Sequence, residues 1–219
     1  MAARPLRFLV LGATGGTGKH FIAQALREGH AVRALVRNPG KLLATTDATG
    51  KLEVVKGSIT ETVDTDKLVE GVDFVVSMLG DRAAQANGKI VFPFVQKLVP
   101  SMRRHGVKRF LYQAGGLSKP YGGSLTTFLW LLRNTVARGF NGQHEDNEAV
   151  MEYLATDAND LEWIVHRAGI GADGPSKGVL ERSATSFSVA SHLDCATYSY
   201  GLVRNDEAVR SCEFSMYKK

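Results

Sequence analysis

The most informative stretch of this chain reads Phe8-Leu9-Val10-Leu11-Gly12-Ala13-Thr14-Gly15-Gly16-Thr17-Gly18. A short apolar run ends in three glycines that follow one another at intervals of three residues. The next segment carries apolar side chains on one side of a helical repeat, at Phe21, Ile22, Ala25 and Leu26. This order predicts a strand, a tight glycine turn and an amphipathic helix.

Each glycine of the turn has its own physical task. Gly12 permits the tight turn, Gly15 lets phosphates approach the backbone, and Gly18 lets helix and strand pack closely. The phosphates then meet free N–H groups at the positive end of the helix. The stretch therefore predicts a binding site for a dinucleotide pyrophosphate. The alternative is a glycine-rich turn without a ligand.

The composition is that of an ordinary globular domain. Of 219 residues, 44% are hydrophobic and 22% are charged, so we expect one domain over residues 1–219. Cys195 and Cys212 form neither a disulfide framework nor a metal-binding spacing, and no metal site is predicted. The first residues carry no secretory signal, and charges interrupt the apolar stretches before membrane-spanning length. We expect a cytoplasmic protein without a membrane partner.

The net charge of +5 is modest. The densest basic cluster lies in residues 103–109, where a helix is expected to end, and positive charge is favourable there. Nucleic-acid binding needs a broader basic stripe or a recognised module, and the sequence has neither. No nucleic-acid partner is expected.

Strand-like and helical segments alternate along the chain. Strands are predicted at residues 6–11, 30–36, 52–56, 74–79, 109–113 and 161–166, and helices at 19–28, 65–70, 90–105 and 147–156. This alternation predicts an α/β fold of the doubly wound (Rossmann) type, a mainly parallel sheet with helices on both faces.

Ligands bind such sheets outside the carboxyl ends of the strands. That rule gathers four predicted strand ends around one cleft: Gly12, Arg37, Gly80 and Gln113. The substrate pocket is expected to come from the C-terminal part, at about residues 113–145 and 167–219.

A turn-rich insert, Ser118 to Ser124, leads into an apolar stretch that contains Phe128 and Trp130. Because it follows a strand end, we expect it to wall or cover the cleft, where aromatic side chains suit a flat, apolar substrate. The alternative is ordinary core packing. The sequence leaves open whether residues 124–140 form a lid.

The second strand indicates which dinucleotide binds. A NAD-selective site usually has an acid at the end of this strand, but residues 31–41 contain none. Arg37 stands at the strand end with Lys41 nearby, and a guanidinium binds the 2′-phosphate of NADP bidentately. The sequence therefore predicts NADP(H), and Arg33 is expected to be a surface or supporting charge.

Five motifs occur together in this chain: the glycine turn, Leu35-Val36-Arg37-Asn38-Pro39, Gly71-Val72-Asp73-Phe74-Val75-Val76-Ser77, Val107-Lys108-Arg109-Phe110 and Asp160-Leu161-Glu162-Trp163-Ile164-Val165-His166-Arg167. This set resembles the atypical short-chain dehydrogenase/reductase group, especially its NmrA-like and biliverdin-reductase-B (flavin-reductase)-like branches.

The resemblance implies where the cofactor lies. Residues 14–17 would touch the phosphates, Ser58 and Ile59 would lie near adenine, Leu79 and Gly80 beside a ribose, and residues 168–170 along the nicotinamide. Ser58 replaces a usual Asp, and Ala168 a usual Pro. The full set of expected cofactor contacts is Gly12, Thr14, Gly15, Gly16, Thr17, Gly18, Arg37, Lys41, Ser58, Ile59, Leu79, Gly80, Gln113, Ala114, Ala168, Gly169 and Ile170.

The chain lacks the Ser, Tyr and Lys that typical members of the resembled superfamily use for proton transfer. No tyrosine has a lysine four residues later, and alignment places Gln143 and Asn147 at the Tyr and Lys positions. The usual Ser pair becomes Gln113-Ala114, and amides do not titrate near neutral pH.

Other side chains are candidates for the chemistry. The catalytic candidates are His144, Gln113 and Tyr121, with Tyr112 an equal alternative to Tyr121. His144 has an accessible pKa, although the acids beside it are also explained by a helix dipole.

Three functions follow from these features. The first is an NADP(H)-dependent reductase that acts on a conjugated or aromatic small molecule and relies on cofactor positioning. The second is an NmrA-like sensor of the NADP(H) redox state that docks a protein partner without turnover. The third is a non-oxidative isomerase or cyclase on the same scaffold.

Overall fold

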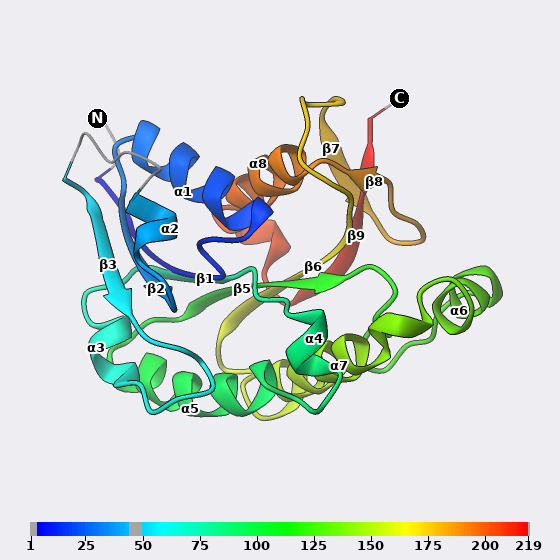
Figure 1. Ribbon diagram of the computed structural model, residues 1–219, viewed down its shortest axis with the longest axis horizontal. Helices are drawn as coiled ribbons and strands as arrows, with labels where there is room; N and C mark the ends of the chain where they lie inside the picture. The colour runs from blue at the N-terminus through cyan, green and yellow to red at the C-terminus, as the bar shows by residue number, and fades with distance from the viewer. Residues whose placement is uncertain (1–3, 44–49, 219) are drawn as a thin grey trace.

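A mostly parallel sheet runs through the centre of the protein, with helices on both faces (Figure 1). The computed structural model describes residues 4–43 and 50–218. The main path of the sheet has the order β3-β2-β1-β4-β5-β6-β9-β7, in which only β7 is antiparallel to its neighbour, and β8 pairs with β6. The strands are β1 (Arg7–Leu11), β2 (Ala31–Val36), β3 (Leu52–Lys56), β4 (Phe74–Ser77), β5 (Arg109–Gly115), β6 (Glu162–Ile170), β7 (Leu180–Ser183), β8 (Val189–Ala190) and β9 (Ser211–Tyr217).

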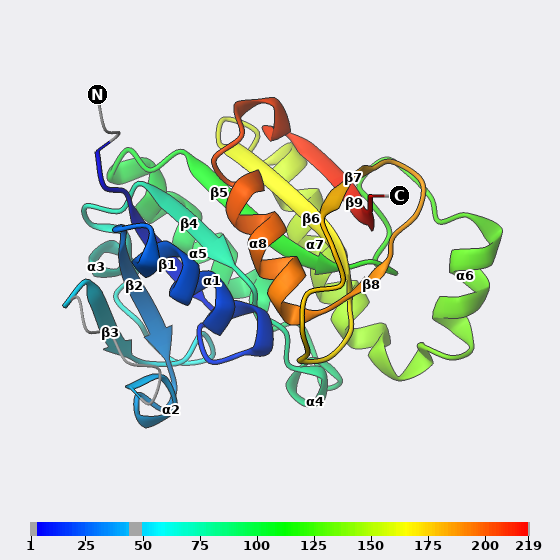
Figure 2. The ribbon, with the colours of Figure 1, turned by 90° about the horizontal axis from the view of Figure 1, so that it is seen from above.

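Two groups of helices enclose this sheet, as Figures 1 and 2 show. One face is covered by α1 (Gly16–Arg27) and α8 (His192–Leu202), and the other by α3 (Thr65–Val69), α5 (Val91–Arg104) and α7 (Asn141–Thr156). The shorter elements are α2 (Gly40–Leu43), α4 (Arg82–Gln85), α6 (Thr127–Asn134), η1 (Arg138–Phe140) and η2 (Asp206–Ala208). Within the described ranges, no helix combines the length and apolar character needed to span a membrane.

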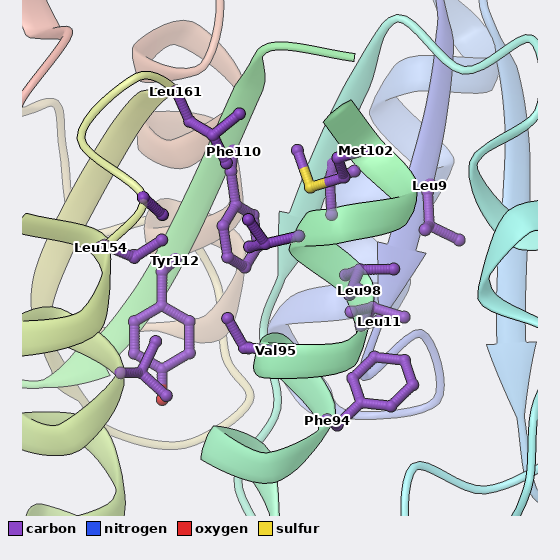
Figure 3. Close-up of a cluster of buried hydrophobic side chains, with 14 of the residues drawn as sticks. Leu9, Leu11, Phe94, Val95, Leu98, Met102, Phe110, Tyr112, Leu154 and Leu161 are labelled. Carbon is purple, nitrogen blue, oxygen red and sulfur yellow. The ribbon is translucent and has the colours of Figure 1, made fainter. Parts of the chain in front are cut away.

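The strands are apolar on both sides because each face of the sheet packs against helices. Leu9 of β1 and Phe110 of β5 join Leu98 and Met102 of α5 in one core, part of which is drawn in Figure 3. Phe8, the neighbour of Leu9, points to the opposite face and packs with residues of α1 and α8. The predicted doubly wound α/β fold is therefore confirmed.

The C-terminal part of the sheet was not predicted. The sequence indicated a last strand ending at His166, but β6 continues to Ile170 and three further strands follow it. β9 pairs with β6 in parallel, and β7 closes the edge by pairing antiparallel with β9. β7 and β8, with four and two residues, are too short to show a periodic pattern, whereas the polar and apolar alternation of β9 was overlooked.

The start of α7 also differs from the prediction. The helix begins at Asn141 instead of Asn147, so the acids after His144 do not lie in its first turn. Asp146 is fully buried and accepts hydrogen bonds from three backbone N–H groups at the start of α5, those of residues 90–92. This carboxylate stabilises the dipole of a neighbouring helix instead of its own.

Arg33 has a structural role. Its side chain is buried, and Nη1 donates to the carbonyl oxygens of Lys67, Leu68 and Glu70 at 2.7, 2.9 and 2.8 Å. These carbonyls lie at the end of α3, where backbone acceptors lack helical partners. Arg33 therefore caps α3 from the adjacent strand.

The segment expected to wall or cover the cleft projects from the body of the protein (Figures 1 and 2). It forms α6, in which Phe128 and Trp130 are 72% and 57% exposed. Only Leu129 of this helix is buried. The expectation that Phe128 and Trp130 line the substrate space is therefore wrong for this structure.

Candidate functional site

The glycine turn joins β1 to α1 at the carboxyl edge of the sheet. Gly12 has a φ of +81°, and a Cβ there would lie 2.4 Å from the Met78 carbonyl oxygen. A Cβ on Gly18 would lie 2.2 Å from the Gly12 carbonyl oxygen. Glycine is required at Gly12 by the backbone conformation and the close approach, and at Gly18 by the packing of α1 on the turn.

The start of α1 offers free N–H groups to a ligand. Its N-cap is Gly15, which has no side chain to accept from the helix, and its first turn contains no acid. The backbone N–H groups of the first turn have no acceptor within the helix. An uncapped, positive helix end built from glycines fits a pyrophosphate.

Two adjoining hollows lie along this edge. The first, of about 260 Å³, lies between the ends of β1 and β2 and the start of α5. The second, of about 380 Å³, lies between the ends of β5 and β6 and the start of α7. They share the walls Gly15, Met78, Leu79 and Gly80. Cavities of this order suit small-molecule ligands, and the glycine turn lies where the two meet.

The first hollow contains most of the residues expected at the adenosine end. The predicted residues that line it are Gly12, Thr14, Gly15, Arg37, Ser58, Ile59, Leu79 and Gly80. Asp81, Ile90 and Val91 also line it, and no motif in the sequence marks them. They come from the segment before α4 and from the start of α5, which the chain path brings beside β1.

Arg37 stands at the rim of the first hollow. Its guanidinium is 74% exposed, and Nη1 lies 3.3 Å from Oδ2 of Asp81. Oδ1 of Asp81 accepts from the Ala84 N–H and caps α4. A phosphate group at this rim would therefore compete for Arg37 with the Asp81 carboxylate, which its hydrogen bond to Ala84 holds in place.

The second hollow contains the residues expected at the other end of the ligand. The predicted residues that line it are Gly15, Gly16, Thr17, Leu79, Gly80, Gln113, His144, Ala168, Gly169 and Ile170. Gln143 and Asn147, which align with the Tyr and Lys of the resembled superfamily, also line it. The structure therefore places three amide side chains at the positions of the missing catalytic set.

The aromatic wall of the second hollow comes from Phe140 and Phe187. A Cβ on Gly116 would lie 2.9 Å from the Phe187 ring, and one on Gly169 only 2.2 Å from it. The ring therefore fits because two glycines face it. Phe187 was missed by sequence reasoning, although the glycines of two adjacent strand ends were a signal that something packs there.

A family model described as NAD(P)H-binding matches residues 12–196. The match begins at the first glycine of the turn and includes nearly all the residues that line both hollows. The chain belongs to this NAD(P)H-binding family. The uncapped α1 and its glycine turn are the parts of the structure that fit the pyrophosphate of such a cofactor.

Known proteins with related sequence or fold include a plant relative and several bacterial structures. The isoflavone reductase homolog IRL of Zea mays is 32% identical over 125 residues, which cover 53% of this chain and 38% of that relative. This chain therefore matches well under half the length of that protein.

Three solved structures share the fold at low identity. The oxidoreductase ylbE of Lactococcus lactis has a TM-score of 0.71 at 16% identity, covering 98% of this chain and 92% of its own. A short-chain dehydrogenase/reductase of Veillonella parvula has a TM-score of 0.72 at 12% identity, and the match covers 98% of this chain and 95% of that one. ChuY, an anaerobillin reductase of Escherichia coli O157:H7, has a TM-score of 0.72 at 15% identity, and the match covers 97% of this chain and 98% of that one.

Four of the predicted site residues line neither hollow. Gly18 lies behind the turn, and Ala114 faces the core beneath α5 and α7. Lys41 is exposed on α2, outside both hollows. Tyr121 is 53% exposed and lines a separate surface hollow beside α7. The structure thus does not bring Tyr121 to either hollow, and Tyr112, its alternative, is fully buried.

His144 is the one histidine among the predicted catalytic candidates, and it is neutral at physiological pH. Burial, reinforced by the Arg133 guanidinium and opposed by Glu148, lowers the pKa of His144 to about 4. His144 as a whole is only 5% exposed. His144 therefore does not carry a dissociable imidazolium proton near pH 7.

The remaining histidines near the sheet edge have structural partners. His166 is fully buried between the hydroxyls of Ser199 and Ser215, and burial lowers its pKa to about 3. His192 lines the second hollow and lies 3.0 Å from Asp173. His166 is a packed residue, whereas His192 belongs to the wall of the second hollow.

Proposed function

We propose that the protein is an NADP(H)-dependent reductase of the atypical short-chain type, acting on a flat conjugated or aromatic small molecule. The observation that carries this proposal is the pair of adjoining hollows on one glycine turn. One has an arginine at its rim and no acid at the end of β2. The other is walled by two phenylalanines and amides.

The residues have separable tasks in this proposal. The start of α1 binds the pyrophosphate, and Arg37 binds the 2′-phosphate. A bound reduced nicotinamide supplies a hydride. Phe140 and Phe187 hold the flat substrate in the second hollow and exclude water, so that proximity and orientation contribute most of the acceleration.

Support for the redox reaction comes from the names of similar proteins, which include an isoflavone reductase homolog and an anaerobillin reductase. The side chains of this chain add a further constraint. Gln143 and Asn147 do not titrate near neutral pH, so the proton that completes reduction comes from water.

The first test of the proposal is cofactor binding followed by turnover. Calorimetry should show that Arg37→Ala weakens NADPH binding by about tenfold to a hundredfold, the value of a charge-assisted hydrogen bond, and NADH binding much less. Lys41→Ala is the matched control, because Lys41 lies outside the hollow and should change neither affinity. Equal losses for both cofactors in Arg37→Ala would refute the NADP assignment.

Turnover is measured as loss of reduced-nicotinamide absorbance with a panel of quinones, flavins and enones. Oxidation of NADPH that depends on one of these acceptors is the expected result. Tight binding of NADPH without oxidation by any of them would refute a reductase for those three substrate classes.

A second candidate function, an NADP(H) redox sensor, is favoured by one further observation. Phe128, Trp130, Leu131 and Val136 are all more than half exposed in and just after α6, at 72%, 57%, 53% and 83%. Exposed apolar groups of this kind occur at protein–protein contacts. Recovery of a protein partner with only one redox form of the cofactor, without turnover, would favour the sensor.

A further inference from the structure

Four buried side chains, two of which line the second hollow, form one chain of hydrogen bonds. The Tyr112 hydroxyl lies 2.6 Å from Oδ1 of Asn147, and Nδ2 of Asn147 lies 3.1 Å from Oγ of Ser118. Oγ of Ser118 lies 3.2 Å from Nδ1 of His144. All four residues are at most 5% exposed. The chain therefore runs from β5 through α7 to the imidazole without contact with bulk water.

The direction of each hydrogen bond follows from the chemistry of the groups. Tyr112 donates to the amide oxygen of Asn147, so the amide nitrogen faces Ser118, and that nitrogen is only a donor. Ser118 Oγ accepts from it and has its own proton left to donate to Nδ1 of His144. In a neutral imidazole with Nδ1 accepting, the ring proton resides on Nε2.

That N–H group is a buried donor without a partner. Nε2 of His144 and Nε2 of Gln113 are both buried, and neither has a hydrogen-bond partner within residues 4–43 and 50–218. Both residues line the second hollow. A buried donor without an acceptor is costly, and two such donors in the wall of one cavity are satisfied by a ligand that brings an acceptor.

We propose that His144, as the Nε2–H tautomer, and Gln113 are neutral donors that bind a carbonyl oxygen of the substrate in the second hollow. The proposal rests on the reductase function and narrows its substrate to flat molecules in which the reducible system carries a carbonyl group. Ser118, Asn147 and Tyr112 are positioning residues, because their hydrogen bonds to one another and to His144 hold its tautomer.

The donors also match the charge that reduction creates. A hydride delivered to the substrate carbon would move the π pair of the conjugated carbonyl onto its oxygen. Preorganised N–H groups stabilise that negative oxygen, which then takes a proton from water. The neutral state of His144 is maintained by its burial and by Arg133, with Glu148 opposing it; these two are the charged groups that act on it within the described chain.

The first experiment reads the tautomer directly and needs neither cofactor nor turnover. Nitrogen-15 NMR of histidine-labelled protein at neutral pH should show the His144 resonance, assigned by its loss in His144→Gln, as a neutral ring protonated on Nε2. In Ser118→Ala the same ring should become a mixture of tautomers. A ring protonated on Nδ1, or a charged ring, in the unsubstituted protein would overturn the proposal.

The second experiment measures ligand binding to the protein saturated with NADP⁺, in which reduction does not occur. Equilibrium dialysis compares a dimethylnaphthoquinone with dimethylnaphthalene, which has a similar flat shape and no acceptor. The quinone should bind more tightly. In His144→Asn the amide ends near the position of Nδ1 and does not reach that of Nε2. This variant should bind the quinone about tenfold more weakly, the effect of losing a typical neutral hydrogen bond, and should bind the hydrocarbon with unchanged affinity.

His144→Gln is the matched variant, because its amide nitrogen reaches the position of Nε2 and should restore most of the quinone affinity. The donor site would be overturned if His144→Asn and His144→Gln lost the same quinone affinity, or if the quinone and the hydrocarbon lost affinity equally. It would also be overturned if the unsubstituted protein did not prefer the quinone. A loss of NADP⁺ affinity in His144→Asn would assign the donor to the cofactor instead. Failure of the unsubstituted protein to bind NADP⁺ would refute the reductase proposal itself and leave the tautomer result standing.

Discussion

Replacement of Asp146 tests whether one buried carboxylate on α7 holds the start of α5 in place. Its Oδ2 accepts from Gln85 Nε2 at 2.8 Å and from the N–H groups of Ile90 and Val91 at 3.0 and 2.9 Å, and its Oδ1 accepts from the Phe92 N–H at 2.9 Å. The N-cap residue of α5, Ile90, provides no side-chain acceptor of its own. Asp146 therefore supplies the cap of this helix from a different part of the chain.

The size of the effect follows from these bonds. Asp146→Asn keeps one acceptor oxygen but turns the other into an amide nitrogen that faces an N–H donor. We expect a loss of about 2 kcal/mol in the free energy of unfolding, for one charge-assisted hydrogen bond and the interaction with the helix dipole. Asp146→Ala leaves four donors without an acceptor and should cost about 3–5 kcal/mol.

Urea denaturation followed by circular dichroism measures both losses. The matched control is Asp64→Asn, the same chemical change at the exposed N-cap of α3, where Asp64 accepts from the Lys67 N–H. Asn caps a helix about as well as Asp, so this control should change stability by less than about 0.5 kcal/mol. If Asp146→Asn costs no more than the control, the capping argument is refuted. NADPH binding should also weaken in Asp146→Asn, because Ile90 and Val91 line the first hollow.

Three further predictions concern the turn, the histidines and the rim of the first hollow. Gly18→Ala should destabilise the protein by about 3 kcal/mol or more in chemical denaturation, because its Cβ would meet the backbone of Gly12. Gly201→Ala, at an exposed position of α8 with open space around it, should stabilise the protein by up to about 1 kcal/mol. Similar changes in stability for the two variants would contradict the packing argument. Burial lowers the pKa of His144 to about 4 and of His166 to about 3, from an ordinary 6.5. The unfolded chain therefore binds protons more readily, and lowering the pH from 7 to 5 should reduce the free energy of unfolding by about 2 kcal/mol for each histidine; denaturation midpoints that do not change over this range would rule this out. Asp81→Ser keeps the acceptor that caps α4 and removes the negative charge at the rim of the first hollow. Calorimetry should then show several times tighter binding of NADPH and an unchanged affinity for NADH. Weaker NADPH binding would argue against a phosphate at this rim.

Much of the fold and most of the lining of the first hollow could be predicted from local patterns. The first six strands were identified because each is an apolar run next to a turn or a helical repeat, and the glycine turn specified its own conformation. Prediction failed for the C-terminal strands. β7 and β8, with four and two residues, are too short for a periodic pattern, whereas β9 alternates polar and apolar residues and was overlooked. The place of β9 beside β6 depends on pairing with a strand about 45 residues earlier in the chain.

The substrate half of the site was predicted less well, and the reason is visible in particular residues. Tyr121 and Phe128 had suitable chemistry and sequence positions near a strand end, but the chain carries both away from the second hollow. Phe187 occupies the wall instead, from a segment without any recognisable motif. Loops between elements have no periodicity, so the sequence does not indicate which side chain they deliver to a pocket.

The sequence by itself determined the order of the first six strands and of α1, α3, α5 and α7 between them, the glycine turn and the absence of an acid at the end of the second strand. These features depend on side-chain period and on backbone conformations that a residue imposes on itself and its near neighbours. Only the tertiary structure decided that Asp146 caps a neighbouring helix, that Phe187 faces Gly169, and that Ser118 and Asn147 direct the proton of His144. Each of these is a contact between groups distant in the chain, whose partners are selected by packing and by the need to satisfy buried polar atoms.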